Sequence, residues 1–222
     1  LASGLAGRTP VLLVNGGAAA DGRPSIVVDN HGGAVAAVEH LIAIGRKRIA
    51  HIAGPAGNLE AEARLAGYLE AMAKAGLPTM VIDGTFTKAS GQAAGEMLAG
   101  RDDRPDAVFP ANDNMAVGAL LAFQDAGLRV PEDVAMVGFD DIPLAGLVRP
   151  GLTTLKINIA ETGRNALERL VRLIGSAADT ACEVVRPELV VRASSNPLIS
   201  PSGLSGAASD NKQTLSLEGE KL

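Results

Sequence analysis

Polar side chains collect where the predicted strands of this sequence end. Short apolar or β-branched runs are typical of buried strands, and nearly all of them are followed by Asn, Asp or a tight turn. The residues at these points are Asn15, Asp29 with Asn30, Gly54-Pro55, Asp83-Gly84, Asn112-Asp113 and Asp140-Asp141. In open parallel α/β sheets, ligands bind beyond the carboxyl ends of the strands. Carboxylates and amides gathered there favour recognition of hydroxyl groups.

Helix capping is the alternative explanation for several of these residues, because Asn and Asp are favoured N-caps. It accounts well for Asp113 and Asn30, which stand before helical segments. It accounts less well for Asp140, because the segment Ile142-Pro143-Leu144 lacks a clear helical start. We therefore expect Asp140 to contact a ligand.

The sequence lacks the residue arrangements that catalysis or metal binding requires. Its three histidines are scattered, and none has a second His at metal-ligand spacing. Neither a Gly-x-Gly-x-x-Gly loop after a strand nor a Walker loop is present. The pair Ser194-Ser195 has no convincing catalytic partner, and the single Cys182 excludes an internal disulfide. Binding without chemistry, cofactor or metal is the better interpretation; an enzyme on a similar scaffold is the alternative.

Strands and helices alternate along the chain, which predicts an α/β fold with parallel sheets covered by helices. The predicted strands are Val11–Val14, Ser25–Val28, Arg48–Ile52, Met80–Ile82, Ala107–Phe109 and Val134–Val137. The predicted helices are a segment from Ala34 to Ile42 that ends at Gly45, and the segments Leu59–Ala75, Ser90–Ala99, Asn114–Ala126 and Ile159–Ile174.

Composition limits the possible partners. The net charge is −5, and no cluster of Lys and Arg suited to duplex DNA appears. No secretory signal and no run of about 20 apolar residues is found, so we expect a cytoplasmic protein without membrane contact. From about residue 196 to 222 the chain is rich in Ser, Gly and Ala without periodicity, which predicts a disordered tail.

Several segments, in their order and spacing, resemble the lactose-repressor (LacI/GalR) family of transcription regulators. They are Val28–Ala34, Gly45–Pro55, Arg64–Tyr68, Phe109–Gly118, Gly127–Val134, Val137–Asp141 and Leu152–Thr154. The resemblance implies a two-lobed fold of the periplasmic-binding-protein type that closes on a ligand. The first lobe, incomplete here, would comprise residues 1–28 and 159–183, and the second would comprise 29–158 and 184–195.

The same resemblance implies which residues face the cleft between the lobes. They are Asn15, Asp29, Asn58, Glu60, Arg64, Phe86, Asn112 and Asp140. A guanidinium such as that of Arg64 suits vicinal hydroxyls or a carboxylate. The ring of Phe86 would stack on the ligand, although it could equally be a packed core ring. A sugar or sugar derivative is the expected effector, and a purine is the main rival.

Partners follow from the resemblance as well. The family's helix-turn-helix headpiece has no counterpart in this sequence, so we expect operator DNA to be bound only through a headpiece outside this chain. The helix Asn114–Ala126 is apolar almost all the way round, which predicts that it needs a second covering surface in a homodimer. A periplasmic sugar-binding protein of an ABC transporter, which shares the fold, is the alternative function.

Overall fold

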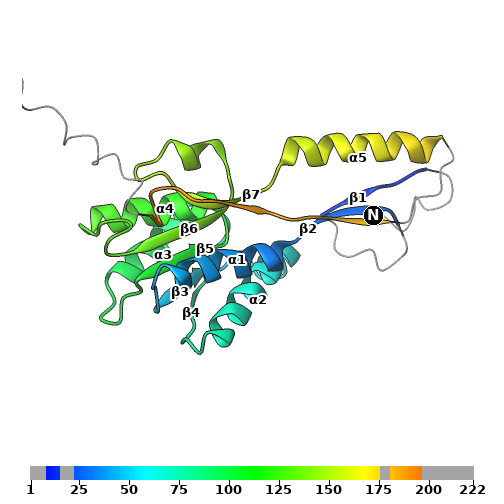
Figure 1. Ribbon diagram of the computed structural model, residues 1–222. Helices are drawn as coiled ribbons and strands as arrows, with labels where there is room; N and C mark the ends of the chain where they lie inside the picture. The colour runs from blue at the N-terminus through cyan, green and yellow to red at the C-terminus, as the bar shows by residue number, and fades with distance from the viewer. Residues whose placement is uncertain (1–8, 16–22, 176–180, 197–222) are drawn as a thin grey trace, which may run out of the picture.

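Two separate sheets form the framework of the chain (Figure 1). The computed structural model describes residues 9–15, 23–175 and 181–196. The small sheet has the order β1-β2-β8 and is parallel, with β1 (Leu13–Val14), β2 (Ser25–Val28) and β8 (Cys182–Val185). The large sheet has the order β4-β3-β5-β6-β7-β9, and only β9 is antiparallel to its neighbour. Its strands are β3 (Ile49–Ile52), β4 (Met80–Ile82), β5 (Ala107–Pro110), β6 (Ala135–Asp140), β7 (Thr153–Lys156) and β9 (Glu188–Val190).

Helices cover both faces of the large sheet. Successive residues of a strand point to opposite faces, and the apolar residues on each face pack against a pair of helices. Phe109 packs in one core with α1 (Asn30–Ala43) and α2 (Leu59–Lys74). Its neighbour Val108 packs in the other core, with α3 (Lys88–Ala99) and α4 (Asp113–Asp125). The α/β fold expected from the sequence is confirmed. In the described segments, no helix is both long and apolar enough to cross a membrane.

The fifth helix belongs to the small sheet. In α5 (Ile159–Ile174), the buried side chain of Arg169 donates hydrogen bonds to the carbonyl oxygens of Ser25 and Ala181, at 3.0 and 2.8 Å. These bonds tie α5 to β2 and to the residue before β8. The N-cap of α5 is Asn158, whose side-chain oxygen accepts from the amide of Glu161.

The chain passes between the two sheets three times (Figure 1). The passages lie between β2 and α1, between β7 and α5, and between β8 and β9. Strand β8 pairs with β2 as far as Val185, so the last passage begins two residues later than the expected boundary at residue 183. The expected tail, residues 196–222, lies outside the described residues except for Asn196.

Helix α4 finds its second covering surface inside the same chain. Nine of its residues are buried, and they contact both the large sheet and α3. The expectation that a partner subunit must cover this apolar helix therefore had the wrong premise, because α3 lies against it. Leu121 is the large apolar side chain of α4 that stays exposed.

Glycines make the contact between α3 and α4 close. A Cβ atom at Gly91 would lie 2.1 Å from the carbonyl oxygen of Met115, and one at Gly118 would lie 2.1 Å from that of Lys88. Both distances are far below van der Waals contact, and the opposing atoms are backbone. The two helices can approach this closely only because these positions lack side chains.

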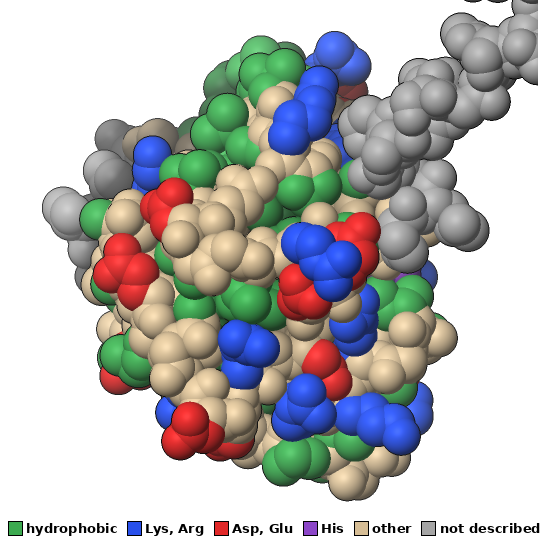
Figure 2. All heavy atoms as spheres, turned by 90° about the vertical axis from the view of Figure 1, so that its left-hand side faces the viewer, with side chains coloured by type: hydrophobic (Ala, Val, Ile, Leu, Met, Phe, Trp, Pro, Cys, Tyr) green, Lys and Arg blue, Asp and Glu red, His purple; other side chains and the backbone are tan. Residues whose placement is uncertain are grey.

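Charges of both signs are mixed on the end of the large-sheet lobe that faces away from the small sheet (Figure 2). Ion pairs on the surface join Arg48 with Asp106, Arg101 with Asp103, and Arg129 with Asp133. Pairing of this kind cancels the local positive charge that a phosphate backbone would require.

The α3–α4 contact predicts the effect of one added methyl group. Gly118→Ala should lower the free energy of unfolding by about 1–3 kcal/mol, because overpacking against backbone forces the helices apart. Gly163→Ala is the matched control, since nothing lies within 4 Å of a Cβ at this position in α5. The control should be neutral or stabilising by up to about 1 kcal/mol, because Ala favours helix over Gly. Urea denaturation measures both, and equal effects at the two positions would contradict the account.

Candidate functional site

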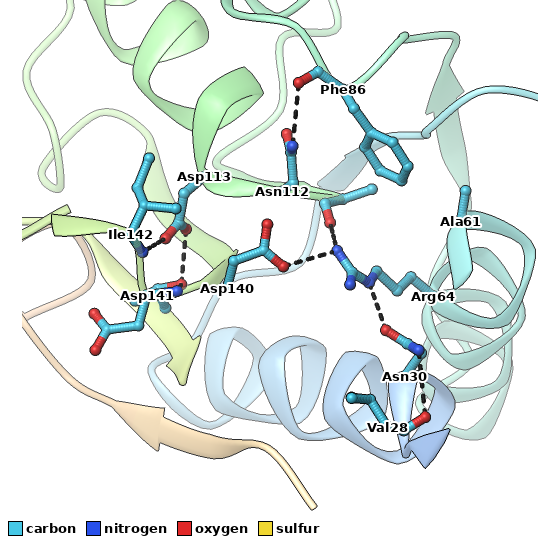
Figure 3. Close-up of polar contacts among 12 residues, drawn as sticks. Val28, Asn30, Ala61, Arg64, Phe86, Asn112, Asp113, Asp140, Asp141 and Ile142 are labelled. Carbon is cyan, nitrogen blue, oxygen red and sulfur yellow. Dashed lines mark hydrogen bonds and ion pairs between the residues drawn. The ribbon is translucent and has the colours of Figure 1, made fainter. Parts of the chain in front are cut away.

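A buried arginine joins four elements at the carboxyl ends of the large-sheet strands (Figure 3). Arg64 of α2 donates from Nε to Asn30 Oδ1 at 2.8 Å and from Nη1 to the carbonyl oxygen of Ala111 at 2.6 Å. Its Nη1 also lies 3.3 Å from Asp140 Oδ1, at the end of β6. The side chain is 5% exposed. Its Nε and Nη1 donors are thus directed to partners within the chain.

Aromatic rings hold the guanidinium in its plane. The Cζ atom of Arg64 lies 3.8 Å from the ring centroid of Phe139 and 5.9 Å from that of Phe86. Both distances are within the range of cation–π attraction. Phe86 itself has a positive φ of 61°, and its ring occupies the space that a Cβ at Gly54 would need. Phe86 is also packed against the α3–α4 core, as the core interpretation of this ring expects, while its stacking on a ligand stays a prediction.

The turn after β6 is held in an uncommon backbone conformation. Asp140 and Asp141 have φ angles of 111° and 55°, a region that non-glycine residues rarely adopt. Arg192 donates to Asp141 Oδ1 at 2.7 Å, and Asp113 Oδ2 accepts from the amide of Ile142 at 3.0 Å. These contacts on both sides of the turn direct the carboxylate of Asp140 toward Arg64 (Figure 3).

Asp113 lies fully buried beneath this turn. Its Oδ1 accepts a hydrogen bond from Thr154 Oγ1 at 2.7 Å. Burial raises the pKa of Asp113 to about 7, and the negative charges of Asp140 and Asp141 add to the rise. The hydrogen bonds from Thr154 and Ile142 act in the opposite direction but are outweighed.

Asp140 is a charged group poised for titration near neutral pH. Burial raises its pKa to about 6, against the lowering effect of the Arg64 charge and hydrogen bond; Glu60 raises it further. The carboxyl side chain remains 27% exposed, so it is open to solvent or to a ligand.

Three of the residues expected at the cleft are helix N-caps. Asp29 accepts from the amide of Gly32, Asn58 from that of Ala61, and Asn112 from that of Met115. We expected Asn30 and Asp113 to cap two of these helices. The N-caps are instead Asp29 and Asn112, in each case one residue earlier in the chain. Asn112 also donates to the carbonyl oxygen of Phe86 at 3.1 Å.

A hollow of about 330 Å³ lies beside the arginine cluster. Its lining comes from both sides of the passage between the sheets: Asn15, Val27, Val28, Asn30, Leu59, Glu60 and Ala63. Asn30 belongs both to this lining and to the partners of Arg64, and Glu60 acts electrostatically on Arg64 and Asp140. The hollow and the cluster therefore adjoin each other at Asn30, although Arg64 and Asp140 do not line the hollow. Asn15 Oδ1 accepts from the amide of Val28 at 3.2 Å.

Sequence reasoning missed three residues of this site. Asn30 and Asp113 were assigned to capping, and Phe139 was given no role beyond its place in the segment Val137–Asp141. Only the folded chain brings the Phe139 ring beneath Arg64, because the two residues are far apart in the sequence. Within the described residues, no group of three or more His, Cys, Asp or Glu side chains is arranged to hold a metal ion.

The raised pKa of Asp113 predicts a change of stability with pH. An unfolded Asp ionises near pH 3.9, whereas folded Asp113 ionises near 7. The folded state therefore binds this proton more tightly, and the resulting stabilisation is complete below pH 3.9 and lost as pH rises through about 7. Asp113→Asn, which has no charge to bury, should gain on the order of 2 kcal/mol over the wild type between pH 5 and pH 8.

Urea denaturation at the two pH values measures this difference. Asp133→Asn is the control, because Asp133 is a half-buried partner of the exposed Arg129, and this pairing lowers the pKa of Asp133 to about 2. Asp133 is ionised in both the folded and the unfolded protein across this pH interval. The difference in the free energy of unfolding between Asp133→Asn and the wild type should therefore stay constant. A constant difference for Asp113→Asn as well would show that the buried carboxyl does not titrate in this range.

Comparison with known proteins relates this architecture to a family. The model of the periplasmic binding protein-like domain matches residues 38–195. The HTH-type transcriptional regulator CelR of Thermobifida fusca is 40% identical over 171 residues, which cover 75% of this chain and 50% of CelR. The chain spans about half the length of the curated relatives it matches.

Solved structures give the same relationship. A sugar-binding transcriptional regulator (LacI family) from Escherichia coli, complexed with phosphate, has a TM-score of 0.77 at 31% identity; the match covers 83% of this chain and 68% of that one. A CelR-cellobiose complex has a TM-score of 0.73 at 34% identity, over 86% of this chain and 68% of that one.

Proposed function

We propose that this chain, which belongs to the LacI family of transcriptional regulators, senses a small polyhydroxylated effector that binds between its two lobes. The observation that carries the proposal is the buried Arg64–Asp140 pair beside the hollow, at the strand ends where α/β proteins bind ligands. Effector binding would change the angle between the lobes and, through it, the spacing of DNA-binding headpieces. The role is binding rather than catalysis, in the cytoplasm.

The charges of the site favour an uncharged effector that donates hydrogen bonds. Asp140 and Glu60 are two carboxylates near one guanidinium, and Arg64 already has partners within the chain. An anionic ligand would meet net negative charge, whereas sugar hydroxyls can donate to the carboxylates. A CelR-cellobiose complex among the similar structures supports a sugar as the effector. A purine is the second candidate, because the ring of Phe86 lies close to the guanidinium of Arg64.

Dimerisation through the region of α4 remains part of the proposal on a different ground. Leu121 of α4 is exposed, as are Leu144 and Leu147 in and after the short 3₁₀ helix Pro143–Gly146. Gln124 of α4 donates to the carbonyl oxygen of Arg149 at 2.6 Å, which ties the helix to this segment. Exposed apolar side chains on these two connected segments are suited to a contact between two copies.

Membership of the LacI family favours a regulator over a periplasmic sugar-binding protein of an ABC transporter. The latter would have an export signal upstream in its gene, whereas the regulator would have a helix-turn-helix. Sequencing the parent gene separates the two.

Asp140→Asn is the variant that tests the proposed anchor. It keeps the size of the side chain and removes the charge, and loss of one partner from a buried charged pair typically costs about 2–5 kcal/mol. We expect binding to weaken at least tens-fold for the best ligand from a thermal-shift panel of cellobiose, other mono- and disaccharides, guanine and hypoxanthine. Because the pKa of Asp140 is raised to about 6, wild-type affinity for a hydroxyl donor should also fall as pH drops below 6.

Calorimetry at pH 7.5 and pH 5.5 gives both results. Asp133→Asn should leave the affinity unchanged, since Asp133 is paired with Arg129 on the surface. Unchanged affinity in Asp140→Asn would remove Asp140 from the site. A guanine or hypoxanthine that binds while every saccharide fails would overturn the sugar proposal.

DNA binding by the 222-residue chain alone is expected to be absent. Specific readout needs a helix that presents side chains to base edges in the major groove. Each of α1 to α4 buries an apolar stripe against the large sheet, the net charge is −5, and Figure 2 shows basic side chains among acidic ones. A gel shift at low salt with the parent gene's own promoter makes the test. A competitor-resistant complex would place the DNA-binding function within this chain.

A further inference from the structure

Three aspartates and two arginines meet at the turn after β6, so the charges of this cluster do not balance. Asp140 is paired with Arg64 at 3.3 Å, and Asp141 is paired with Arg192 at 2.7 Å. Asp113 forms no ion pair in the part of the chain that the structure describes. Its two oxygens accept only from a hydroxyl and a backbone amide (Figure 3). A fully buried carboxylate without a cation is costly, and the usual outcome is that it takes up a proton.

The position of Asp113 is built closely into the fold. A Cβ atom at Gly138 would lie 2.1 Å from Asp113 Oδ1, so the carboxyl fills space that only glycine leaves open in β6. The amide that it binds, Ile142, directly follows the two residues with positive φ. Asp113 therefore fixes the end of the turn that carries Asp140, without itself reaching the hollow.

We propose that Asp113 is a positioning residue that holds the one proton of this carboxyl cluster, and that its neutral state lets Asp140 stay ionised for the effector. The inference rests on the proposed function, because it takes Asp140 as the residue that anchors the effector. A neutral Asp113 keeps both contacts, because one oxygen can carry the proton and donate to Thr154 Oγ1 while the other accepts from Ile142. The turn is thus held in place without a second negative charge beside Asp140.

Every charged group that faces Asp113 is part of this balance. Asp140, the last residue of β6, and Asp141, which follows it, disfavour ionisation of Asp113; Arg64, from α2, interacts favourably with Asp113 when Asp113 is charged. Arg192, from the segment after β9, is engaged by Asp141. The N-terminus of α4, where Asp113 lies in the first turn, also favours an anion. Burial outweighs these favourable contributions and keeps the pKa of Asp113, at about 7, above that of Asp140, at about 6.

Carbon-detected NMR of protein labelled with ¹³C at the aspartate carboxyls tests the proposal without any ligand. In the wild type, the Asp113 resonance should titrate near pH 7 and that of Asp140 about one unit lower. Asp140→Asn should lower the Asp113 midpoint by at least about half a unit, because a neighbouring negative charge is gone. Asp133→Asn, which removes a distant surface carboxyl, should leave the Asp113 midpoint unchanged.

Two further variants separate positioning from simple folding. Asp113→Asn is a neutral isostere and should keep the amide resonances of Asp141 and Ile142 in place, whereas Asp113→Ala should shift both. A titration midpoint of Asp113 at a lower pH than that of Asp140 in the wild type would overturn the proposal. This comparison needs only the wild-type protein, so no substitution disturbs the cluster. So would an Asp113 midpoint that Asp140→Asn leaves unchanged, or equal amide shifts in the Asn and Ala variants. Because no ligand is involved, such failures would leave the proposed effector role of the cleft standing.

Discussion

The buried guanidinium of Arg64 is the constraint on which the arrangement of the site depends. A charged group at 5% exposure is stable only if its donors are satisfied, and here they reach α1 through Asn30, the end of β5 through Ala111 and the end of β6 through Asp140. Phe139 covers one face of the plane at 3.8 Å. Loss of Asp140 would remove the opposite charge of this buried cation, and loss of Asn30 or the Ala111 carbonyl would leave one of its donors without an acceptor, so the four elements must keep their relative positions.

Fixed positions of the strand ends explain why backbone strain is concentrated around them. Asp140, Asp141 and Phe86 all have positive φ angles, and all lie next to the arginine cluster. Such conformations cost of order 1–3 kcal/mol each and persist only where surrounding contacts hold them. The contacts in question are those from Asp113, Arg192 and Asn112. These contacts hold the strand ends of the large sheet at the side from which three chain passages lead to the small sheet.

The fold was accessible from the sequence where local patterns agree with burial. Periodicity predicted all five helices and the strands β1 to β6. The apolar residues of α1 to α4 face one of the two cores, whereas α5 contributes to neither. Periodicity did not predict β7, β8 or β9. In β7, Thr153 and Thr154 read as polar, but in the structure they are buried and hydrogen-bonded to Arg192, Ser194, Ser195 and Asp113. The partnerships of Arg64 with Phe139 and of Asp113 with Ile142 depend on long-range packing. Residue types alone identified the candidates Asp140 and Asn112 but not which side chains meet.

A crystal structure of the protein with the saccharide selected by the thermal-shift panel tests the central claim most directly. The account predicts a ligand hydroxyl within about 3 Å of the Asp140 carboxylate, in the hollow lined by Asn15 and Glu60. Arg64 should still donate to Asn30 and Ala111, and Asp113 should still hold Ile142. A ligand seated elsewhere, for example in the hollow lined by Lys156 and Arg186, or one that makes no contact with Asp140, would contradict the account.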